Sequence, residues 1–495
     1  MITINAKQER KIDNFWSHCL FHPTDAVEDP WGKRILDQMA EDGAIKTVRI
    51  YAMLEDIAYL DRNDCLQYDF RLSDLRLDYL LSKGYSLLIS YTGIPDCISE
   101  HTQAAQSNSK NKTRYKGKLF NTNLPRDFAL WEEVCYQYTR HNLERYGIEK
   151  VSEWYFTCFN EPDAAGFFLS SVPSSDVETR AKCYADLYAA FERGIRRAAP
   201  RLKLGGPATC GNFPFLDVFL KEAKKRNLGL DFLSLHNYGT WPGALNTGEA
   251  RICVENNVRK QEKYLEIIKS NGYENTPILV DEWGACSHGF HNKEECPALM
   301  FRENEVFSAY YARLIHRFLA KQFKVERMMI CLSGQHEMTE DFSGFRNFFT
   351  LNFIKKPIYN AYLMASKLGE SLLAYETENE NLSVIPTRKA NGDYAILLTY
   401  AGECFEEDLP ALEESILLPE DAVGKKITAY LIDRTHTNPY RLAEREGITA
   451  APTKEEIARL RCEGTLTPIA ECTCLDRTLP LHLEANATVL EMLED

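Results

Sequence analysis

The sequence contains no C-x-x-C pair and no regular cysteine spacing, although 15 of its 495 residues are cysteines. A disulfide scaffold would need regular spacing, usually in a much smaller chain, so we predict free thiols in a reducing compartment. Cys472 and Cys474 are separated by one residue, but no second pair of ligands lies nearby. We interpret them as two core thiols rather than as a zinc site.

Long apolar runs and long basic runs are also absent. No stretch of about 18 apolar residues is present to cross a bilayer, and the first 15 residues lack the apolar segment of a secretory signal. Acidic residues exceed basic ones, 72 against 58, which gives a net charge of -14. Such a charge repels phosphate backbones and anionic lipids. We therefore predict a cytoplasmic protein whose main partner is neither a nucleic acid nor a membrane.

Glycine-rich nucleotide motifs are missing as well, because no G-x-G-x-x-G and no P-loop follows a strand-like run. The chain does contain eight short apolar runs, at 16–20, 45–51, 85–91, 151–159, 202–206, 230–238, 277–283 and 327–333. They alternate with segments of helical periodicity, the clearest at 125–147, 175–200, 253–271, 302–322 and 357–368. Eight strands alternating with helices predict parallel pairing, and at this length a closed (β/α)8 TIM barrel rather than an open sheet.

The rest of the sequence has a different texture. From residue 369 to 495, short β-like runs are separated by turn residues and acidic stretches, with a helical insert around 453–462. This pattern predicts an accessory β-sandwich. Residues 1–15 contain one more β-like run, which we assign to the same sandwich. The predicted architecture is an α/β TIM barrel over residues 16–368 with a C-terminal accessory β-sandwich.

Two glutamates stand at the ends of predicted strands. Glu161 follows the fourth run in Phe-Asn-Glu-Pro, and Glu282 ends the seventh in Val-Asp-Glu-Trp-Gly. Because the carboxyl ends of all barrel strands meet on one face, both carboxylates should point into one pocket. Each could instead be an ordinary surface acid. The pair, each beside an aromatic residue and one preceded by Asn160, favours a functional site.

Two carboxylates in one pocket are the groups that cleave glycosidic bonds. One protonates the leaving oxygen, while the other attacks the anomeric carbon or activates water there. A retaining mechanism needs about 5–5.5 Å between them, a separation that strands facing each other across a barrel mouth can supply. Asn160 would hydrogen-bond the sugar 2-hydroxyl, a contact that strengthens in the transition state. This chemistry requires neither a metal nor an organic cofactor.

The ordered set of motifs resembles glycoside hydrolase family 39 of clan A, which is typified by β-xylosidases. Phe159-Asn160-Glu161-Pro162 resembles the Asn-Glu-Pro signature of the clan, and Asp281-Glu282-Trp283 resembles its nucleophile strand. Further segments that resemble the family are 204–208, 235–239, 356–362, 433–440 and 452–457. The resemblance therefore covers nearly the whole chain.

The resemblance implies a role for each of nine residues. Glu161 would be the general acid/base, Glu282 the nucleophile, and Asn160 the ligand of the 2-hydroxyl. Arg49 would pair with Glu282 and help keep it ionised, while Glu161, nearer the apolar wall, stays protonated. The other implied pocket residues are His236, Tyr238 as a hydrogen-bond partner of Glu282, Glu337 near the sugar hydroxyls, and Trp241 and Trp283 as a sugar platform.

Several of these residues also fit purely structural roles. His236 could be a satisfied core histidine, Arg49 a structural ion-pair partner, and Trp241 loop packing. His288 and His291 are spaced like a metal pair, but their loop offers no firm further ligand. We assign both histidines to the pocket rim or the surface.

The departures from the family pattern fall at positions expected around the sugar. Tyr51-Ala52 stand where xylosidases of the family usually have His-Gly, and Phe159 and Asp163 replace the usual Trp and Asn around Asn-Glu-Pro. After the eighth run the chain reads Gly334-Gln335-His336 instead of a Ser-Asp-like stretch. Exchanging the partners of buried hydroxyls redirects specificity. The resemblance therefore predicts retaining hydrolysis but leaves the sugar open.

We expect a retaining, exo-acting glycosidase that removes a terminal β-xyloside or related pentoside from short oligosaccharides. Arabinosidase, β-glucosidase, β-galactosidase and α-L-iduronidase activities of the family fit the same residues. A uronate would need a basic pocket, for which the candidates are Arg49, His236, His288, His291 and the loop 112–118. A non-catalytic carbohydrate-binding protein on the same barrel is the alternative from a different class. A homo-oligomer fits the resemblance, but no segment identifies an interface.

Overall fold

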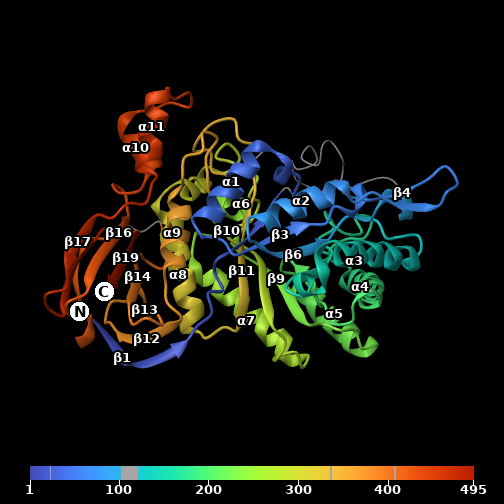
Figure 1. The fold of residues 1–495 in the computed structure, drawn as a ribbon, viewed down its shortest axis with the longest axis horizontal. Helices are drawn as coiled ribbons and strands as arrows, with labels where there is room; N and C mark the ends of the chain where they lie inside the picture. Colours follow the sequence, from blue (N-terminus) through green and yellow to red (C-terminus); the bar gives the residue numbers. More distant parts are fainter. Residues whose placement is uncertain (23, 102–120, 335–336, 406–408) are drawn as a thin grey trace.

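Eight parallel strands close into a barrel in the computed structural model, which describes residues 1–22, 24–101, 121–334, 337–405 and 409–495. The strands follow one another around the barrel in chain order, so the predicted parallel barrel is confirmed (Figure 1). They are β2 (His18–Phe21), β3 (Thr47–Tyr51), β6 (Ser86–Tyr91), β7 (Tyr155–Cys158), β8 (Lys203–Thr209), β9 (Phe232–Thr240), β10 (Ile278–Cys286) and β11 (Val325–Leu332).

Helices cover the outside of the barrel, and polar side chains start several of them. Asp127, Asp176, Asn212 and Asn304 each accept a hydrogen bond from a backbone N–H in the first turn of the helix that follows. The helices between barrel strands are α1 (Pro30–Glu41), α2 (Arg71–Ser82), α3 (Phe128–Val151), α4 (Val177–Ala198), α5 (Phe213–Arg226), α6 (Pro242–Thr247) and α7 (Val254–Ser270); α8 (Glu305–Ala320) precedes β11 and α9 (Pro357–Ser366) follows it. The five predicted helical ranges correspond to α3, α4, α7, α8 and α9.

Short elements lie in the connections. A two-stranded hairpin of β4 (Ala58–Leu60) and β5 (Leu66–Tyr68) projects from the barrel at the right of Figure 1. Single 3-10 turns are η1 (Thr24–Glu28), η2 (Leu54–Asp56), η3 (Asp96–Ile98), η5 (Pro297–Glu303) and η6 (Glu420–Ala422).

The C-terminal part of the chain forms one curled nine-stranded sheet beside the barrel (Figure 1, left). The accessory β-sandwich predicted for this region takes the form of a single curled, sandwich-like sheet. Its first strand is β1 (Ile2–Lys11), which pairs antiparallel with β12 and parallel with β15. The others are β12 (Ser371–Glu376), β13 (Leu382–Arg388), β14 (Tyr394–Tyr400), β15 (Leu412–Leu417), β16 (Lys426–Ile432), β17 (Ala470–Thr473), β18 (Thr478–Leu483) and β19 (Ala487–Glu494).

The central strands β13, β14 and β19 of this sheet are buried on both faces, but against different partners. Alternate side chains, such as Val384, Ile396 and Val489, belong to a core enclosed by the sheet itself. Their neighbours Ile385 and Leu397 face the other way and join the core of the barrel, where α8 packs on β13, β14 and β19. Side chains point to opposite faces in turn along a strand, so near-continuous apolar runs are what a sheet buried on both faces requires.

Two helices interrupt the sheet between β16 and β17. α10 (Pro439–Glu446) and α11 (Lys454–Glu463) stand above it at the top left of Figure 1. The insert predicted around 453–462 corresponds to α11, which Thr453 and Glu456 start with a capping box. Arg441 of α10 holds the buried Glu305 of α8 through two hydrogen bonds of 3.0 and 2.8 Å. The helical insert is thereby tied to the barrel.

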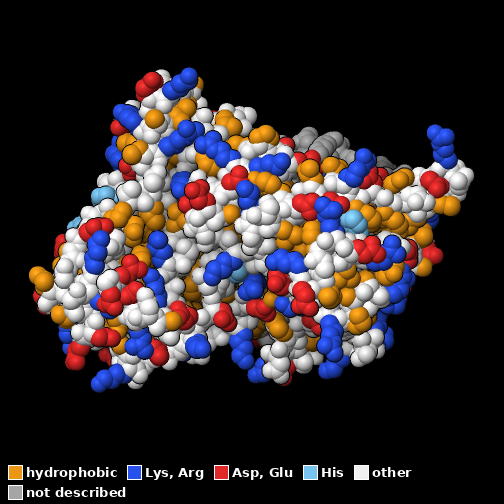
Figure 2. Space-filling model, viewed as in Figure 1, with side chains coloured by type: hydrophobic (Ala, Val, Ile, Leu, Met, Phe, Trp, Pro, Cys, Tyr) orange, Lys and Arg blue, Asp and Glu red, His pale blue; other side chains and the backbone are white. Residues whose placement is uncertain are grey.

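The surface carries charges of both signs close together. Lys and Arg side chains lie among Asp and Glu side chains across the face in Figure 2. Within the described ranges, no helix combines the length and the apolar character needed to cross a membrane.

Candidate active site

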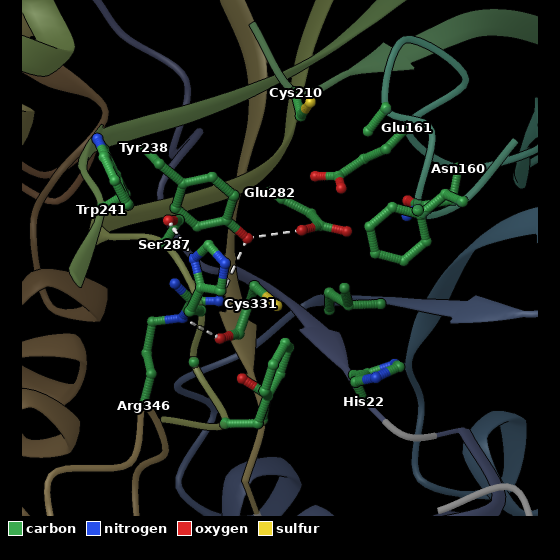
Figure 3. A pocket seen from close by; sticks show the side chains of 18 of the residues that line it. His22, Asn160, Glu161, Cys210, Tyr238, Trp241, Glu282, Ser287, Cys331 and Arg346 are labelled. Carbon is green, nitrogen blue, oxygen red and sulfur yellow. Dashed lines mark hydrogen bonds between the residues drawn. The ribbon is translucent and has the colours of Figure 1, made fainter. Parts of the chain in front are cut away.

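A cavity of about 470 Å³ opens at the carboxyl ends of the barrel strands (Figure 3). Glu161 and Glu282 both line it, as the positions of their strands predict. Their carboxyl groups lie side by side in Figure 3, with Tyr238 beside Glu282 and Asn160 beside Glu161. The other aromatic and charged residues of the wall are Tyr51, Phe167, Trp241, Phe290, Lys260 and Arg346.

Glu161 is presented by a strained turn at the end of β7. Phe159 and Glu161 have left-handed φ angles of 65° and 45°, and Ala208, opposite them on β8, has a φ of 53°. The turn is fixed by the N–H of Phe159, which donates to Tyr91, and by the N–H of Glu161, which donates to Ala208. Left-handed conformations of bulky residues are costly and concentrate at functional sites. Here they turn the Glu161 side chain into the cavity.

Glu282 reaches the cavity through a bulge in β10. The register of β10 shifts between Val280 and Glu282 against β9, and between Val280 and Trp283 against β11. A bulge re-aims the side chains that follow it. Asp281 and Glu282, although consecutive, therefore both contact Arg49 in the barrel interior.

Arg49 of β3 lies fully buried beneath the two glutamates. Its Nη1 donates to Glu282 Oε1 at 2.7 Å, and its Nη2 donates to Asn160 Oδ1 at 2.7 Å. Its Nε lies 3.3 Å from Asp281 Oδ2. The pairing expected between Arg49 and Glu282 is present, and Arg49 additionally orients the amide of Asn160.

β9 supplies two further groups. The ring Nδ1 of His236 lies 2.7 Å from Glu161 Oε1, and the hydroxyl of Tyr238 donates to Glu282 Oε2 at 2.6 Å. The hydrogen bond predicted between Tyr238 and Glu282 is thus present. His236 is buried below the cavity, where it contacts Glu161 rather than open space.

The surroundings shift the pKa values of the two carboxyl groups in opposite directions. Burial raises the pKa of Glu161, and the hydrogen bond to His236 only partly offsets this. Burial acts in the same direction on Glu282. There, however, the charges of His236 and Arg49 and the hydrogen bond from Tyr238 outweigh it, and the pKa falls to about 2. The surroundings therefore favour the protonated form of Glu161 and the ionised form of Glu282.

Trp283 corrects one sequence-based expectation. It was assigned to a sugar platform, but its side chain lies outside the barrel strands, stacked on Tyr311, and its Nε1 donates to Tyr362 at 3.3 Å. The bulge that turns Glu282 inward leaves Trp283 pointing to the helical layer. Trp241, the other platform residue, does line the cavity and is 55% exposed.

Glu337 does not line the cavity either, so its proposed contact with sugar hydroxyls finds no support in the lining residues. Gln335 and His336, which precede it and depart from the family pattern, lie outside the described residues, as does the basic loop 112–118. His288, assigned to the rim or surface, lines the cavity wall.

The other positions that depart from the family pattern differ in their placement. Tyr51 lines the cavity, with its hydroxyl 3.5 Å from Glu282 Oε1. Phe159 is buried against Phe168 instead. Asp163 is also buried, where its carboxylate accepts hydrogen bonds from the backbone N–H groups of residues 210–212 and from Thr209. The expectation that Phe159 and Asp163 surround a bound sugar is therefore wrong, because both support the turns beneath it.

Sequence reasoning missed several residues that shape the site. Arg346, on the loop after β11, donates to the hydroxyl of Tyr238 at 3.2 Å and to two backbone carbonyls. Lys260 of α7 lines the cavity on the side of Cys210, to whose carbonyl its Nζ donates at 2.9 Å. Neither belongs to a recognisable motif. Asp281 carried a signal, because it stands next to Glu282, but strict strand alternation would have turned it away.

Glu161, His236 and Glu282 each present a donor atom, and the three atoms lie within 4.8 Å of one another. Such a cluster would suit a metal ion, but the Arg49 guanidinium already supplies a positive charge at Glu282. The arrangement fits an acid/base pair held by side chains.

Comparison with known proteins gives consistent matches. The family model described as glycosyl hydrolases family 39 matches residues 1–474. The chain is 25% identical over 485 residues to a β-xylosidase of Caldicellulosiruptor saccharolyticus, covering 93% of this chain and 90% of the relative. It is 24% identical over 310 residues to the α-L-iduronidase of Mus musculus, covering 56% and 42%. A monomeric β-xylosidase from Caulobacter crescentus CB15 has a TM-score of 0.84 at 19% identity, covering 100% of this chain and 99% of that one.

Proposed function

Because this chain belongs to glycosyl hydrolases family 39 and is therefore a glycoside hydrolase, we propose that it works with retention of configuration, with Glu282 as nucleophile and Glu161 as general acid/base. The observation that carries this proposal is that the surroundings shift the pKa values of two neighbouring carboxyls in opposite directions. Glu282 has a pKa of about 2, whereas the pKa of Glu161 is raised by burial. Environments that separate two such pKa values assign the acid and the nucleophile.

The distance between the carboxyls supports retention rather than inversion. One carboxylate oxygen of Glu161 and one of Glu282 lie within 4.8 Å of each other. Retaining enzymes have their carboxyls about 5–5.5 Å apart, whereas inverting enzymes need about 6.5–9.5 Å to admit a water between them. The short separation of these oxygens therefore favours retention.

In the first step the Glu282 carboxylate attacks the anomeric carbon while Glu161 gives its proton to the departing oxygen. Arg49 and Tyr238 hold the two oxygens of Glu282, so attack needs no rearrangement of its partners. Asn160 has its Oδ1 engaged by Arg49. Its Nδ2 is then the atom that can donate to the sugar 2-hydroxyl.

In the second step water hydrolyses the glycosyl ester on Glu282. Glu161, now ionised, takes a proton from that water, and Glu282 leaves as a carboxylate. His236 Nδ1 lies 2.7 Å from Glu161 Oε1, so a protonated ring can donate to Glu161 whether that residue is an acid or a carboxylate. The raised pKa of Glu161 favours return to the protonated form before the next cycle.

For the substrate, we propose a terminal β-xyloside or related pentoside removed from short oligosaccharides by an exo-acting enzyme in the cytoplasm. The relatives and structural neighbours include β-xylosidases, and Tyr51 closes the cavity beside Glu282. All fifteen cysteines lie in the described residues and are free thiols, which suits a reducing compartment.

A uronide such as an α-L-iduronide is the second candidate, because a specific feature of the cavity favours it. Lys260 and Arg346 place two cationic side chains in the wall, and a carboxylate on the sugar would find a partner there. Arg346 is already engaged by Tyr238 and by backbone carbonyls, so Lys260 is the residue that would distinguish the two candidates.

The experiment is hydrolysis of aryl glycosides by the wild type and by Glu282→Ala. The panel contains β-xyloside, β-glucoside, β-galactoside, both arabinoside anomers and α-L-iduronide. We expect turnover of the β-xyloside or one arabinoside, abolished in the variant, with the initial sugar product retaining its anomeric configuration by NMR. Turnover of the iduronide alone, sensitive to Lys260→Met, would favour the second candidate.

Two outcomes would contradict the proposal. Release of the inverted anomer would remove the nucleophilic role of Glu282. Binding of sugars by a folded protein without any turnover would favour the non-catalytic alternative. In that case Glu282→Ala should weaken sugar binding by no more than a few-fold.

A further inference from the structure

Asp281 is a buried acid that the reaction as described does not use. It is fully buried, and the β10 bulge turns its side chain into the barrel interior below Glu282. A carboxylate in such a place is costly unless cations stand beside it. Asp281 therefore needs an explanation beyond packing.

Two potential cations face it. Arg49 Nε lies 3.3 Å from Asp281 Oδ2, and His236 Nε2 lies 3.7 Å from Asp281 Oδ1. The same His236 Nε2 is only 3.4 Å from Arg49 Nη1. A protonated His236 would place two positive groups in contact, which is unfavourable unless a negative charge lies close to both. The carboxylate of Asp281 lies beside both groups.

We propose that Asp281 is a positioning residue for hydrolysis. Its carboxylate balances the positive charges of Arg49 and of a protonated His236, and so helps keep both His236 and Glu161 protonated. This inference rests on the proposed function. Asp281 touches neither cavity nor substrate, and it acts through the two residues that bind Glu282 and Glu161.

In the proposed arrangement Arg49 and His236 are positive, Asp281 and Glu282 are negative, and Glu161 is neutral and ready to act as an acid. The charges of Glu282 and Asp281 raise the pKa of His236 against the effect of burial. Burial raises the pKa of Asp281, and Arg49 and His236 only partly offset this. Other titratable groups facing this cluster are Arg346, Tyr51, Cys331, Asp163, Lys260, Cys210, Tyr238, Tyr184 and Tyr264.

Removing the charge of Asp281 should move the pH profile in one direction. Without it the cluster gains a net positive charge, so the pKa values of Glu161 and His236 both fall. For Asp281→Asn we expect the alkaline limb of kcat/KM to move to lower pH by about 1 unit or more, with kcat reduced and KM little changed. Asp281→Glu keeps the charge and should keep the position of that limb.

Ser234→Ala is the matched control, because it removes a buried hydrogen bond and lowers stability without changing the charge of the site. Ser234 is buried on β9, and its hydroxyl accepts a hydrogen bond from the N–H of Ala208 at 2.9 Å. This variant should lose stability, measured by thermal unfolding, while its pH profile stays in place. If Asp281→Asn shows the same profile as the wild type, Asp281 has only a structural role and the inference is wrong.

A second measurement does not depend on the variant folding. Nitrogen NMR of histidine-labelled wild type, with His236 assigned through His236→Gln, reports whether both ring nitrogens carry protons. We expect both to be protonated at pH 7, and a neutral ring would overturn the inference. An inactive wild type would instead contradict the proposed function, whereas an active wild type with an unshifted Asp281→Asn profile contradicts this inference alone.

Discussion

Arg49 is the residue on which the site is centred. Its Nε, Nη1 and Nη2 face Asp281, Glu282 and Asn160 respectively, so one planar group fixes three side chains from one strand and one turn. A lysine at this position would offer a single point charge and could not span the three partners. Glu282, Asn160 and Asp281 are therefore all oriented by one guanidinium.

Tyr238→Phe tests the hydrogen bond to Glu282. The hydroxyl helps keep the pKa of Glu282 low and orients its Oε2. A hydrogen bond to a charged group contributes about 1.5–3 kcal/mol, so we expect kcat/KM to fall about 10- to 100-fold. Steady-state kinetics on the preferred aryl glycoside measure this. A change confined to KM would mean that Tyr238 contacts the sugar rather than the nucleophile.

The pH dependence of the wild type follows from the same pair. Activity needs Glu282 ionised and Glu161 protonated. The pKa of Glu282 is about 2 and that of Glu161 is raised, so kcat/KM should be flat across mildly acidic pH and fall only on the alkaline side. A profile measured from pH 4 to 9 checks this expectation.

Glu161→Gln assigns the alkaline limb. With an aryl leaving group of low pKa, which needs little protonation, this variant should form its glycosyl ester in a burst that no longer depends on pH. A burst that keeps the wild-type alkaline limb would place the titrating group elsewhere.

At the scale of elements, the alternation of strands and helices predicts the barrel, and the bulge in β10 marks where that reasoning stops. Strict alternation places either Asp281 or Glu282 inside the barrel, while the register shift places both there and turns Trp283 outward. A bulge is decided by pairing with β9 and β11, which the local sequence does not reveal.

The sequence likewise predicts only some of the residues of the candidate site. Glu161, Glu282 and Asn160 could be predicted because motifs at strand ends identify them. Lys260 could not, because it projects from the helical layer beyond β9 and has no motif. Arg346 is likewise brought in by a loop whose path only the folded chain defines.

β19 contains a charge that should make the sheet sensitive to pH. Glu491 points into the core enclosed by the sheet, and burial raises its pKa to about 7. The pKa of Glu491 is higher in the folded state than in the unfolded state. Its protonation therefore contributes fully to the free energy of unfolding below pH 4.5, and this contribution is lost as the pH rises through about 7. Glu491→Gln should increase stability at pH 8 by on the order of 2–3 kcal/mol, with little effect near pH 4.5.

Thermal or urea unfolding at both pH values measures this difference. Glu471→Gln on β17, an edge strand of the same sheet where the residue is exposed, is the matched control and should leave stability unchanged at either pH. An equal gain at both pH values would mean that packing, not ionisation, is responsible.

At the scale of the whole molecule, the helical insert is attached to the barrel by a buried ion pair. Glu305 of α8 accepts hydrogen bonds from Arg441 and from Asn438, and it is almost completely buried. Arg441→Met leaves that carboxylate without its cation, so we expect a loss of about 3 kcal/mol in the free energy of unfolding. Chemical denaturation measures the loss.

The double variant Glu305→Met, Arg441→Met distinguishes the effect of the charges from the effect of packing around them. Because the unpaired buried charge is gone, it should recover most of the stability lost by Arg441→Met alone. If the double variant is no more stable than the single one, packing around α10 rather than the charge accounts for the loss.

The placement of β1 has a consequence for how the protein is made. β1 leaves the ribosome before the barrel, yet its partners β12 and β15 begin only at residues 371 and 412. At about 5–20 residues per second, tens of seconds separate the synthesis of β1 from that of its partners, and all eight barrel strands are synthesised in between. Translation can therefore complete the barrel before the sheet exists, and the sheet closes by pairing late strands with one made before the barrel.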